Sequence, residues 1–186
     1  PIGTSHEAGG SSSFPAGAPR PGGLIVQAPV VVIGVAGPSA SGKTTLCRAL
    51  EAHLGSAQCT VIPMDAYYRD LSALSPEVRA RVDFDRPAAL ELDLLVEHVR
   101  TLRRGGEVDV PDYCFASHTR KESSSRASSI PVVIVEGLFA LAHPGLREEL
   151  DLAVFVEAPD DECLRRRIDR DVATRGRTVD EVTTRY

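Results

Sequence analysis

The chain has 186 residues, 42% of them hydrophobic, and a formal net charge of −5. This length allows one compact domain with a core and is short for two, and the negative charge disfavours binding to nucleic acid or anionic membranes. No stretch approaches the roughly 20 apolar residues that span a bilayer, so a small-molecule partner fits better. Four widely spaced cysteines predict free thiols, and with no leader pattern at the start they predict a cytoplasmic protein.

The first predicted elements surround a glycine-rich turn. Residues 1–28 are rich in Gly, Ser, Pro and Ala, which predicts a disordered tail, and one domain is expected over 29–186. The β-branched run at 30–35 is typical of a strand buried on both faces of a parallel sheet. After the turn, leucines at helical spacing predict a helix from Lys43 to Leu54.

Strands and helices alternate through the rest of the chain. Strands are predicted at 59–64, 108–110, 131–135 and 152–156, helices at 87–104 and 160–174, and a mostly polar loop at 111–130. This alternation predicts an α/β fold with a parallel sheet flanked by helices on both faces. Ligands bind such sheets at the carboxyl ends of the strands, so the residues that follow each strand are the first candidates for a site.

The turn between the first strand and the first helix has the sequence GPSASGKT at 37–44, which fits G-x-x-x-x-G-K-[ST]. In such a loop backbone N–H groups and the helix N-terminus bind phosphate, the lysine reaches the β and γ phosphates, and the Thr hydroxyl ligates Mg²⁺. The sequence therefore predicts binding of ATP, with GTP as an open alternative, together with Mg²⁺. The residues expected to bind the nucleotide are Gly37, Ser39, Ala40, Ser41, Gly42, Lys43, Thr44 and Thr45.

Two absences favour a kinase over a GTPase switch. The chain has no asparagine, which excludes the usual Asn-Lys-x-Asp guanine motif, and none of its aspartates is followed three places later by glycine. A small-molecule kinase instead needs a carboxylate for the acceptor hydroxyl, an acid that holds the metal and cations for the moving phosphoryl group.

Two acids follow predicted strands. Asp65 comes directly after the strand at 59–64 and is a candidate base, with a turn or helix-cap aspartate as the alternative. Glu136 follows the strand at 131–135, where an acid can hold Mg²⁺ directly or through water, with a surface glutamate as the alternative.

The helix at 160–174 carries several arginines, and more follow it. Arginine suits phosphate because its planar guanidinium binds two oxygens at once. A solvated helix with internal salt bridges is the alternative, since acids are interspersed. The arginines are Arg165, Arg166, Arg167, Arg170, Arg175 and Arg177.

Five further blocks accompany the phosphate loop: DAYYR at 65–69, FDRP at 84–87, PDYCFASHTR at 111–120, EG at 136–137, and RRIDRD at 166–171 with RGR at 175–177. Together, over roughly 30–186, they resemble the uridine kinase family of phosphate-loop kinases, which is related to phosphoribulokinase. The resemblance implies that residues 29–186 form a kinase domain with an arginine-bearing helical lid. Members of the family continue past the position of Tyr186 through a further helix and a final strand, which we expect to be missing here.

The resemblance also implies an activity, the Mg²⁺-dependent transfer of the γ-phosphoryl group of ATP to the 5′-hydroxyl of uridine or cytidine. Asp65 would be the base, assisted by Lys43 and Arg170, with Thr44 and Glu136 at the metal and Arg167, Arg170 and Arg175 at the phosphates. The nucleoside would be bound by Asp65, Tyr68, Asp85, Tyr113, Phe115, His118 and Arg177. Family analogy favours a homo-oligomer.

The chain departs from the family pattern next to this pocket. Cys114 stands where the family has aspartate, between two residues expected to contact the base, so the choice between uridine, cytidine and another acceptor stays open. A sister kinase acting on another small alcohol, such as a sugar phosphate or pantothenate, is one alternative. A non-catalytic nucleotide-binding protein is the other.

Overall fold

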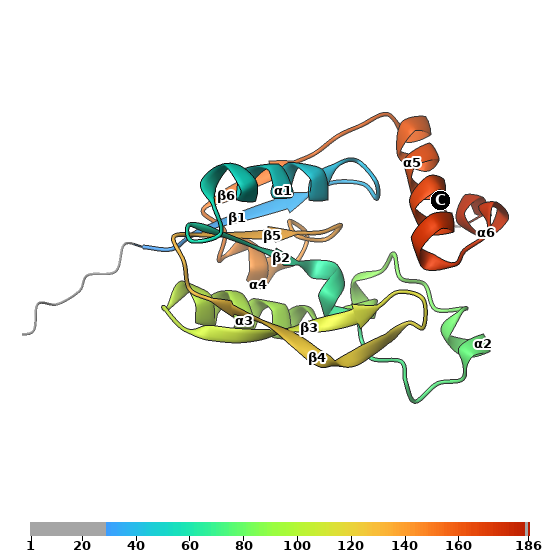
Figure 1. The fold of residues 1–186 in the computed structure, drawn as a ribbon, viewed down its shortest axis with the longest axis horizontal. Helices are drawn as coiled ribbons and strands as arrows, with labels where there is room; N and C mark the ends of the chain where they lie inside the picture. Colours follow the sequence, from blue (N-terminus) through green and yellow to red (C-terminus); the bar gives the residue numbers. More distant parts are fainter. Residues whose placement is uncertain (1–28, 185) are drawn as a thin grey trace, which may run out of the picture.

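The protein is described from a computed structural model that places residues 29–184 and 186, so the tail predicted at 1–28 lies outside the described residues. Its centre is a four-stranded parallel sheet with the spatial order β2-β5-β1-β6 (Figure 1). The strands are β1 (Val31–Ala36), β2 (Cys59–Pro63), β5 (Val132–Glu136) and β6 (Leu152–Phe155). All four were predicted, to within a residue or two at their ends.

Helices cover both faces of the sheet, which confirms the predicted α/β class (Figure 1). On one face Cys47 packs with Val35 and Ile134, and on the other Leu95 and Val133 belong to the larger core cluster. The flanking helices are α1 (Lys43–Leu54) on the first face and α3 (Leu92–Arg103) and α4 (Pro144–Arg147) on the second. None of the helices in the described part of the chain is long and apolar enough to cross a membrane.

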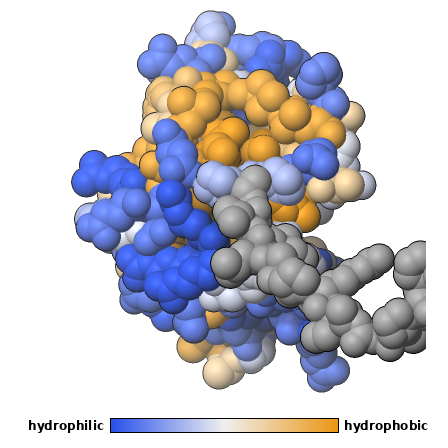
Figure 2. Space-filling model, turned by 90° about the vertical axis from the view of Figure 1, so that its left-hand side faces the viewer, coloured by the Kyte–Doolittle hydropathy of each residue, from blue (hydrophilic) through white to orange (hydrophobic). Residues whose placement is uncertain are grey.

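Burial follows strand position. The inner strand β5 has three fully enclosed residues in a row, Val133, Ile134 and Val135, as its continuous apolar sequence predicts. The edge strand β6 leaves Leu152 and Phe155 more than half exposed. Figure 2 looks at the amino ends of the strands and shows hydrophobic surface gathered in its upper half, the level of α1 and β6 in Figure 1.

The prediction of a polar loop at 111–130 was wrong. This segment contains the second half of one strand and all of the next, and the two strands form a β-hairpin. Strand β3 (Glu107–Cys114) pairs antiparallel with β4 (Thr119–Ser128). Strand β4 is nearly all polar and exposed on both faces, so it lacks the apolar alternation that marks a strand. Its strand conformation comes from pairing with β3, whose Val108 and Val110 are buried in the main core.

The helix predicted to open at Pro87 begins later. Pro87–Ala89 forms a short 3₁₀ turn (η2), Leu90 is extended and bridged to Tyr68, and α3 begins at Leu92. This bridge and the hydrogen bond from Glu91 N to Tyr67 O (2.9 Å) hold the segment out of helical geometry. The remaining elements are η1 (Met64–Tyr67), α2 (Pro76–Arg79), α5 (Asp160–Arg175) and α6 (Val179–Thr184).

The carboxyl ends of the strands meet at one edge of the sheet. Glu136 is the last residue of β5 rather than the residue after it, and in the strand register it lies between Pro63 of β2 and Val35 of β1. The next residue, Gly137, donates from its N to Val35 O at 3.0 Å, and a Cβ there would lie 2.4 Å from Met64 Cβ. Only glycine therefore lets the chain leave β5 beside η1. Helix α5 stands across this edge, where Figure 1 shows it with α6.

Candidate active site

The loop between β1 and α1 has the backbone conformation of a phosphate loop. Gly37, Ala40 and Gly42 have positive φ values of 148°, 63° and 105°. A Cβ at Gly37 would lie 2.2 Å from the carbonyl oxygen of Val156, so no larger residue fits there. The loop closes directly onto the N-terminus of α1, the end of a helix that attracts anions.

Lys43, the first residue of α1, is only 8% exposed. Its Nζ donates to the carbonyl oxygens of Gly37 at 2.8 Å and Pro38 at 2.6 Å. Burial lowers the pKa of the ammonium, and the Glu136 and Asp65 carboxylates oppose that shift. The cation is thus held against the backbone of the loop and beside two acids.

Thr44 and Glu136 form the pair predicted at the metal. Thr44 Oγ1 donates to Glu136 Oε1 at 3.0 Å, and burial raises the pKa of the glutamate. A hydroxyl and a carboxylate are hard oxygen donors, and Mg²⁺ in kinases takes one or two such ligands from protein and the rest from phosphate and water. The donor set at this position therefore fits Mg²⁺.

Asp65 lies in η1, two residues beyond the end of β2, at the same edge of the sheet as the phosphate loop. Burial in the cleft raises the pKa of its carboxyl, while the charges of Arg175, Arg170 and Lys43 lower it. The Asp65 side chain is 42% exposed to solvent, so an acceptor can reach the carboxylate.

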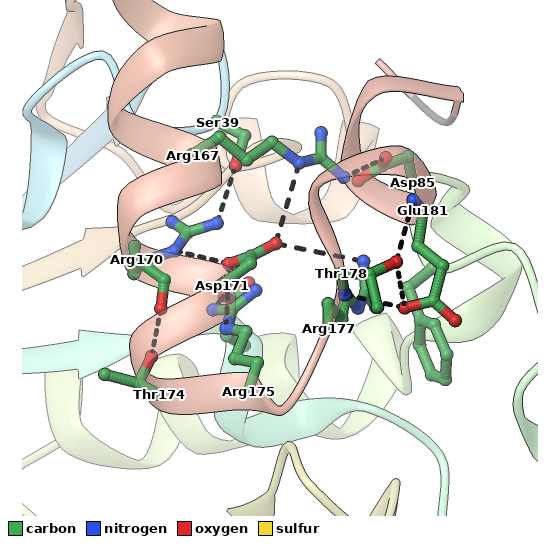
Figure 3. A network of polar contacts seen from close by, with 12 residues as sticks. Ser39, Asp85, Arg167, Arg170, Asp171, Thr174, Arg175, Arg177, Thr178 and Glu181 are labelled. Atoms are coloured by element: carbon green, nitrogen blue, oxygen red, sulfur yellow. Dashed lines mark hydrogen bonds and ion pairs between the residues drawn. The ribbon is translucent and has the colours of Figure 1, made fainter.

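Two arginines of α5 point toward opposite halves of the site (Figure 3). Arg170 Nη2 donates to Ser39 Oγ of the phosphate loop at 3.2 Å, which fits its predicted place near phosphate. Arg167 Nη2 instead pairs with Asp85 Oδ2 at 2.9 Å, although the resemblance implied that it binds phosphate. The phosphate role of Arg167 therefore remains a prediction, and its observed partner, Asp85, is a residue predicted to bind the nucleoside.

Arg175, at the end of α5, lies between the base and the aromatic residues. Its Nη2 is 3.8 Å from Asp65 Oδ2, and its guanidinium carbon lies 4.3 Å from the centre of the Phe115 ring. A cation over an aromatic face is attracted by the ring quadrupole. Arg177, just past the helix, also lines the cleft.

The predicted acceptor residues form an aromatic cluster. The centre of the Tyr68 ring lies 5.3 Å from that of Tyr113 and 6.5 Å from that of Phe115. The Phe84 ring stacks on His118 with 4.4 Å between the ring centres. Sequence reasoning did not include Phe84 among the site residues. Its place in the FDRP block, next to Asp85, was the signal that could have identified it.

One cleft of about 1240 Å³ contains most of these groups. It is bordered by the phosphate loop, η1, the segment at 81–85, the end of β5, and α5 with the turn that follows it. The predicted residues that line it are Ser39, Ala40, Gly42, Lys43, Thr44, Thr45, Asp65, Tyr68, Asp85, Phe115, Glu136, Arg167, Arg170, Arg175 and Arg177. Those that do not are Gly37, Ser41, Tyr113 and His118.

Tyr113 lines a smaller hollow of about 390 Å³ between β2 and the β-hairpin, which shares Asp65 and Phe115 with the large cleft. The residue is only 8% exposed, and within the described part of the chain its hydroxyl has no hydrogen-bond partner. A buried hydroxyl without a hydrogen-bond partner is unfavourable, and a ligand that entered this hollow would supply one.

A phosphate loop at the end of an inner strand of a parallel sheet, faced by a carboxylate and arginines, defines a phosphate-loop kinase. The chain belongs to the phosphoribulokinase / uridine kinase family, whose family model matches residues 32–186. The resemblance predicted from the sequence is thereby confirmed.

Comparison with individual proteins agrees with this assignment. Uridine kinases from Escherichia fergusonii and Escherichia coli K12 are 44% identical to the chain over 160 residues, which are 84% of this chain and 75% of each relative. Phosphoribulokinase from Rhodobacter spheroides has a similar structure, with a TM-score of 0.59 and 20% identity over 84% of this chain and 62% of that one. D-glycerate 3-kinase from Cryptococcus neoformans has a TM-score of 0.59 and 18% identity over 84% and 75%. At these identities the two structures support the fold alone.

Proposed function

We propose that this chain transfers the γ-phosphoryl group of ATP to the 5′-hydroxyl of uridine or cytidine. The observation that carries the proposal is one cleft that is lined by Lys43 of the phosphate loop, Arg170 of α5 and Asp65. A base beside phosphate-binding cations is the arrangement that phosphoryl transfer to an alcohol requires. The relatives named uridine kinase, at 44% identity, supply the acceptor class.

On the donor side, the backbone of the phosphate loop and Lys43 bind the triphosphate, and Thr44 and Glu136 hold Mg²⁺. When bound, the ion would neutralise charge on the β and γ phosphates. Phosphate oxygens would replace the carbonyl oxygens of Gly37 and Pro38 as partners of the ammonium, an exchange favoured by charge.

On the acceptor side, Asp65 accepts the proton of the 5′-hydroxyl, and Asp85 accepts hydrogen bonds from the ribose hydroxyls. Phe115 offers a ring face for a pyrimidine, and Tyr113 a hydroxyl for its polar edge. Cys114 lacks the carboxylate that the family has at this position. Hydrogen bonds from Ser117 lower the pKa of its thiol.

An acceptor panel tests the proposal. Purified protein, Mg²⁺ and labelled ATP would be incubated with uridine, cytidine, purine nucleosides, pantothenate, D-glycerate and a sugar phosphate. We expect a monophosphate from uridine, cytidine or both, and none without Mg²⁺. Product from a non-nucleoside alcohol alone would instead establish a sister kinase. No product from any acceptor, with ATP still bound, would establish a nucleotide-binding protein without this activity.

Tyr113→Phe separates binding from stability. Removing a buried hydroxyl that lacks a partner should raise Tm, whereas losing its hydrogen bond to the base should lower kcat/KM for the nucleoside by up to about tenfold. The matched control is Tyr67→Phe, because the Tyr67 hydroxyl is also buried but pairs with His98 Nδ1 at 2.9 Å. The Tm of that variant should fall, and its kcat/KM should stay the same. An unchanged kcat/KM in Tyr113→Phe would remove this hydroxyl from the acceptor site.

The pH profile should report on Asp65. Only its carboxylate form accepts a proton, so kcat/KM falls as the pH drops through its pKa, which burial raises above the ordinary 3.8. The charge of Arg175 lowers this pKa, so Arg175→Ala should move the acid limb to higher pH. Profiles of kcat/KM would be compared with those of Arg165→Ala, an exposed arginine of the same helix. A limb that stays in place would contradict the assignment.

A further inference from the structure

Asp171 lies at the centre of four arginines and is completely buried (Figure 3). Its Oδ1 is 2.8 Å from Arg170 Nε and 3.5 Å from Arg175 Nε. Its Oδ2 is 3.8 Å from both Arg167 Nε and Arg177 Nη1. One carboxylate thus faces four guanidinium groups, and three of them turn the nitrogen nearest their stem toward it.

The outer nitrogens of the same arginines reach into the site. Arg170 Nη2 contacts the phosphate loop at Ser39, Arg167 Nη2 pairs with Asp85, and Arg175 Nη2 faces Asp65. This division follows from guanidinium geometry, because the rigid fork presents Nε and the terminal nitrogens in different directions. The hydrogen bond from Arg170 Nε to Asp171 fixes where the terminal nitrogens of Arg170 point, and the charge of Asp171 attracts the Nε sides of Arg175 and Arg167 at 3.5 and 3.8 Å.

The backbone of Asp171 also shapes the turn that follows α5. Its carbonyl oxygen accepts from the N–H groups of Gly176 and, at 3.3 Å, of Arg177. Gly176 has a φ of 66°, the left-handed conformation that favours glycine at a helix end. The chain turns back there, so Arg177 joins the same cluster as Arg167, although ten positions separate the two.

Charge explains why a buried acid is needed. Four guanidinium groups gathered around one point repel one another, and burial of charge without a partner is strongly unfavourable. Asp171 offsets one of the four charges and leaves a net positive charge for the anionic phosphates. Asp171 itself is not among the side chains that line the cleft, so it acts on a substrate only through the arginines.

We propose that Asp171 is a positioning residue that aims the terminal nitrogens of Arg167, Arg170 and Arg175 at the phosphoryl group and its acceptor and holds Arg177 beside them. This inference rests on the proposed function, because it assigns the arginines to phosphoryl transfer. The alternative is a buried ion pair that only stabilises α5.

The test compares two asparagine variants on one helix. Asp171→Asn should lower kcat by about 10²-fold, the effect of misplacing catalytic groups by roughly 1 Å. Asp169→Asn, an exposed residue paired with Arg165 at 3.3 Å, should keep the kcat of the unchanged protein. Both values are taken per folded molecule, with the folded fraction measured from thermal unfolding. A lower Tm with kcat unchanged would overturn the proposal.

A double-mutant cycle separates positioning from stability. If Asp171 acts through the arginines, Asp171→Asn should cost clearly less in an Arg170→Ala background than in the unchanged protein. Asp171→Glu, which keeps the charge, should recover part of the lost kcat. Fully multiplicative effects of the two substitutions would overturn the proposal.

Failure of the proposed function has a different signature. The unchanged protein would then phosphorylate neither uridine nor cytidine, and the affinity for Mg²⁺-ATP would be the readout for Asp171. Asp171→Asn should then weaken ATP binding relative to Asp169→Asn, and equal affinities in the two variants would overturn the positioning role.

Discussion

Replacing Asp65 by asparagine is expected to lower kcat by about 10²-fold to 10⁴-fold, the contribution of a positioned general base. The amide keeps the shape of the side chain but cannot accept the proton of the acceptor hydroxyl. Binding of ATP should be unchanged or tighter, because Asp65 lies near Lys43 and Arg170, and removal of its negative charge leaves those cations freer to bind phosphate. Steady-state kinetics and ATP titration measure the two effects separately.

The control for this substitution is Asp109→Asn, at an exposed site on β3 where the carboxylate pairs with Arg126 at 3.5 Å. It makes the same chemical change at a residue that does not line the cleft and should keep full turnover. Undiminished kcat in Asp65→Asn would exclude Asp65 as the base. A loss of ATP binding equal to the loss of kcat would instead indicate that Asp65 organises the nucleotide site.

Lys43→Met is expected to lower kcat by about 10²-fold to 10³-fold, the cost of removing one donor that stabilises charge in a transition state. Methionine keeps the length of the buried stem, so the core of α1 should survive. Because the Lys43 charge lowers the pKa of both Asp65 and Glu136, the acid limb of the remaining activity should also move to higher pH. Single-turnover kinetics and a pH profile measure these effects.

The chain supplies its own control for the lysine, since Lys121 is the other of its two lysines. Lys121 is exposed on β4, and Lys121→Met should leave kcat, KM and the pH profile as they were. Similar losses in the two variants would contradict a specific role for Lys43.

The phosphate loop and the strand ends were predictable because they depend on local sequence. Continuous β-branched runs mark buried parallel strands, and the order strand, glycine-rich turn, helix places Lys43 and Thr44 without knowledge of the rest of the chain. The positions of Asp65 and Glu136 followed from the rule that ligands lie at the carboxyl ends of parallel strands.

The hairpin and the start of α3 were not predictable in this way. Strand β4 is held by its pairing with β3, and its serines and charges alone indicate a loop. Leu90 is held extended by its bridge to Tyr68, which overrides the helical pattern that begins at Pro87. In both cases a contact distant in sequence decides the local conformation.

The sequence by itself determined the class of fold and the phosphate loop, and it supplied most of the candidate acids, arginines and aromatic residues, although not Phe84 or Asp171. Only the tertiary structure decided which of these groups face one another. It paired Arg167 with Asp85, stacked Phe84 on His118, and placed Asp171 at the centre of the arginines. The physical reason is that residue type and spacing set what a side chain can bind, whereas burial and the packing of α5 across the sheet edge select the partner that it meets.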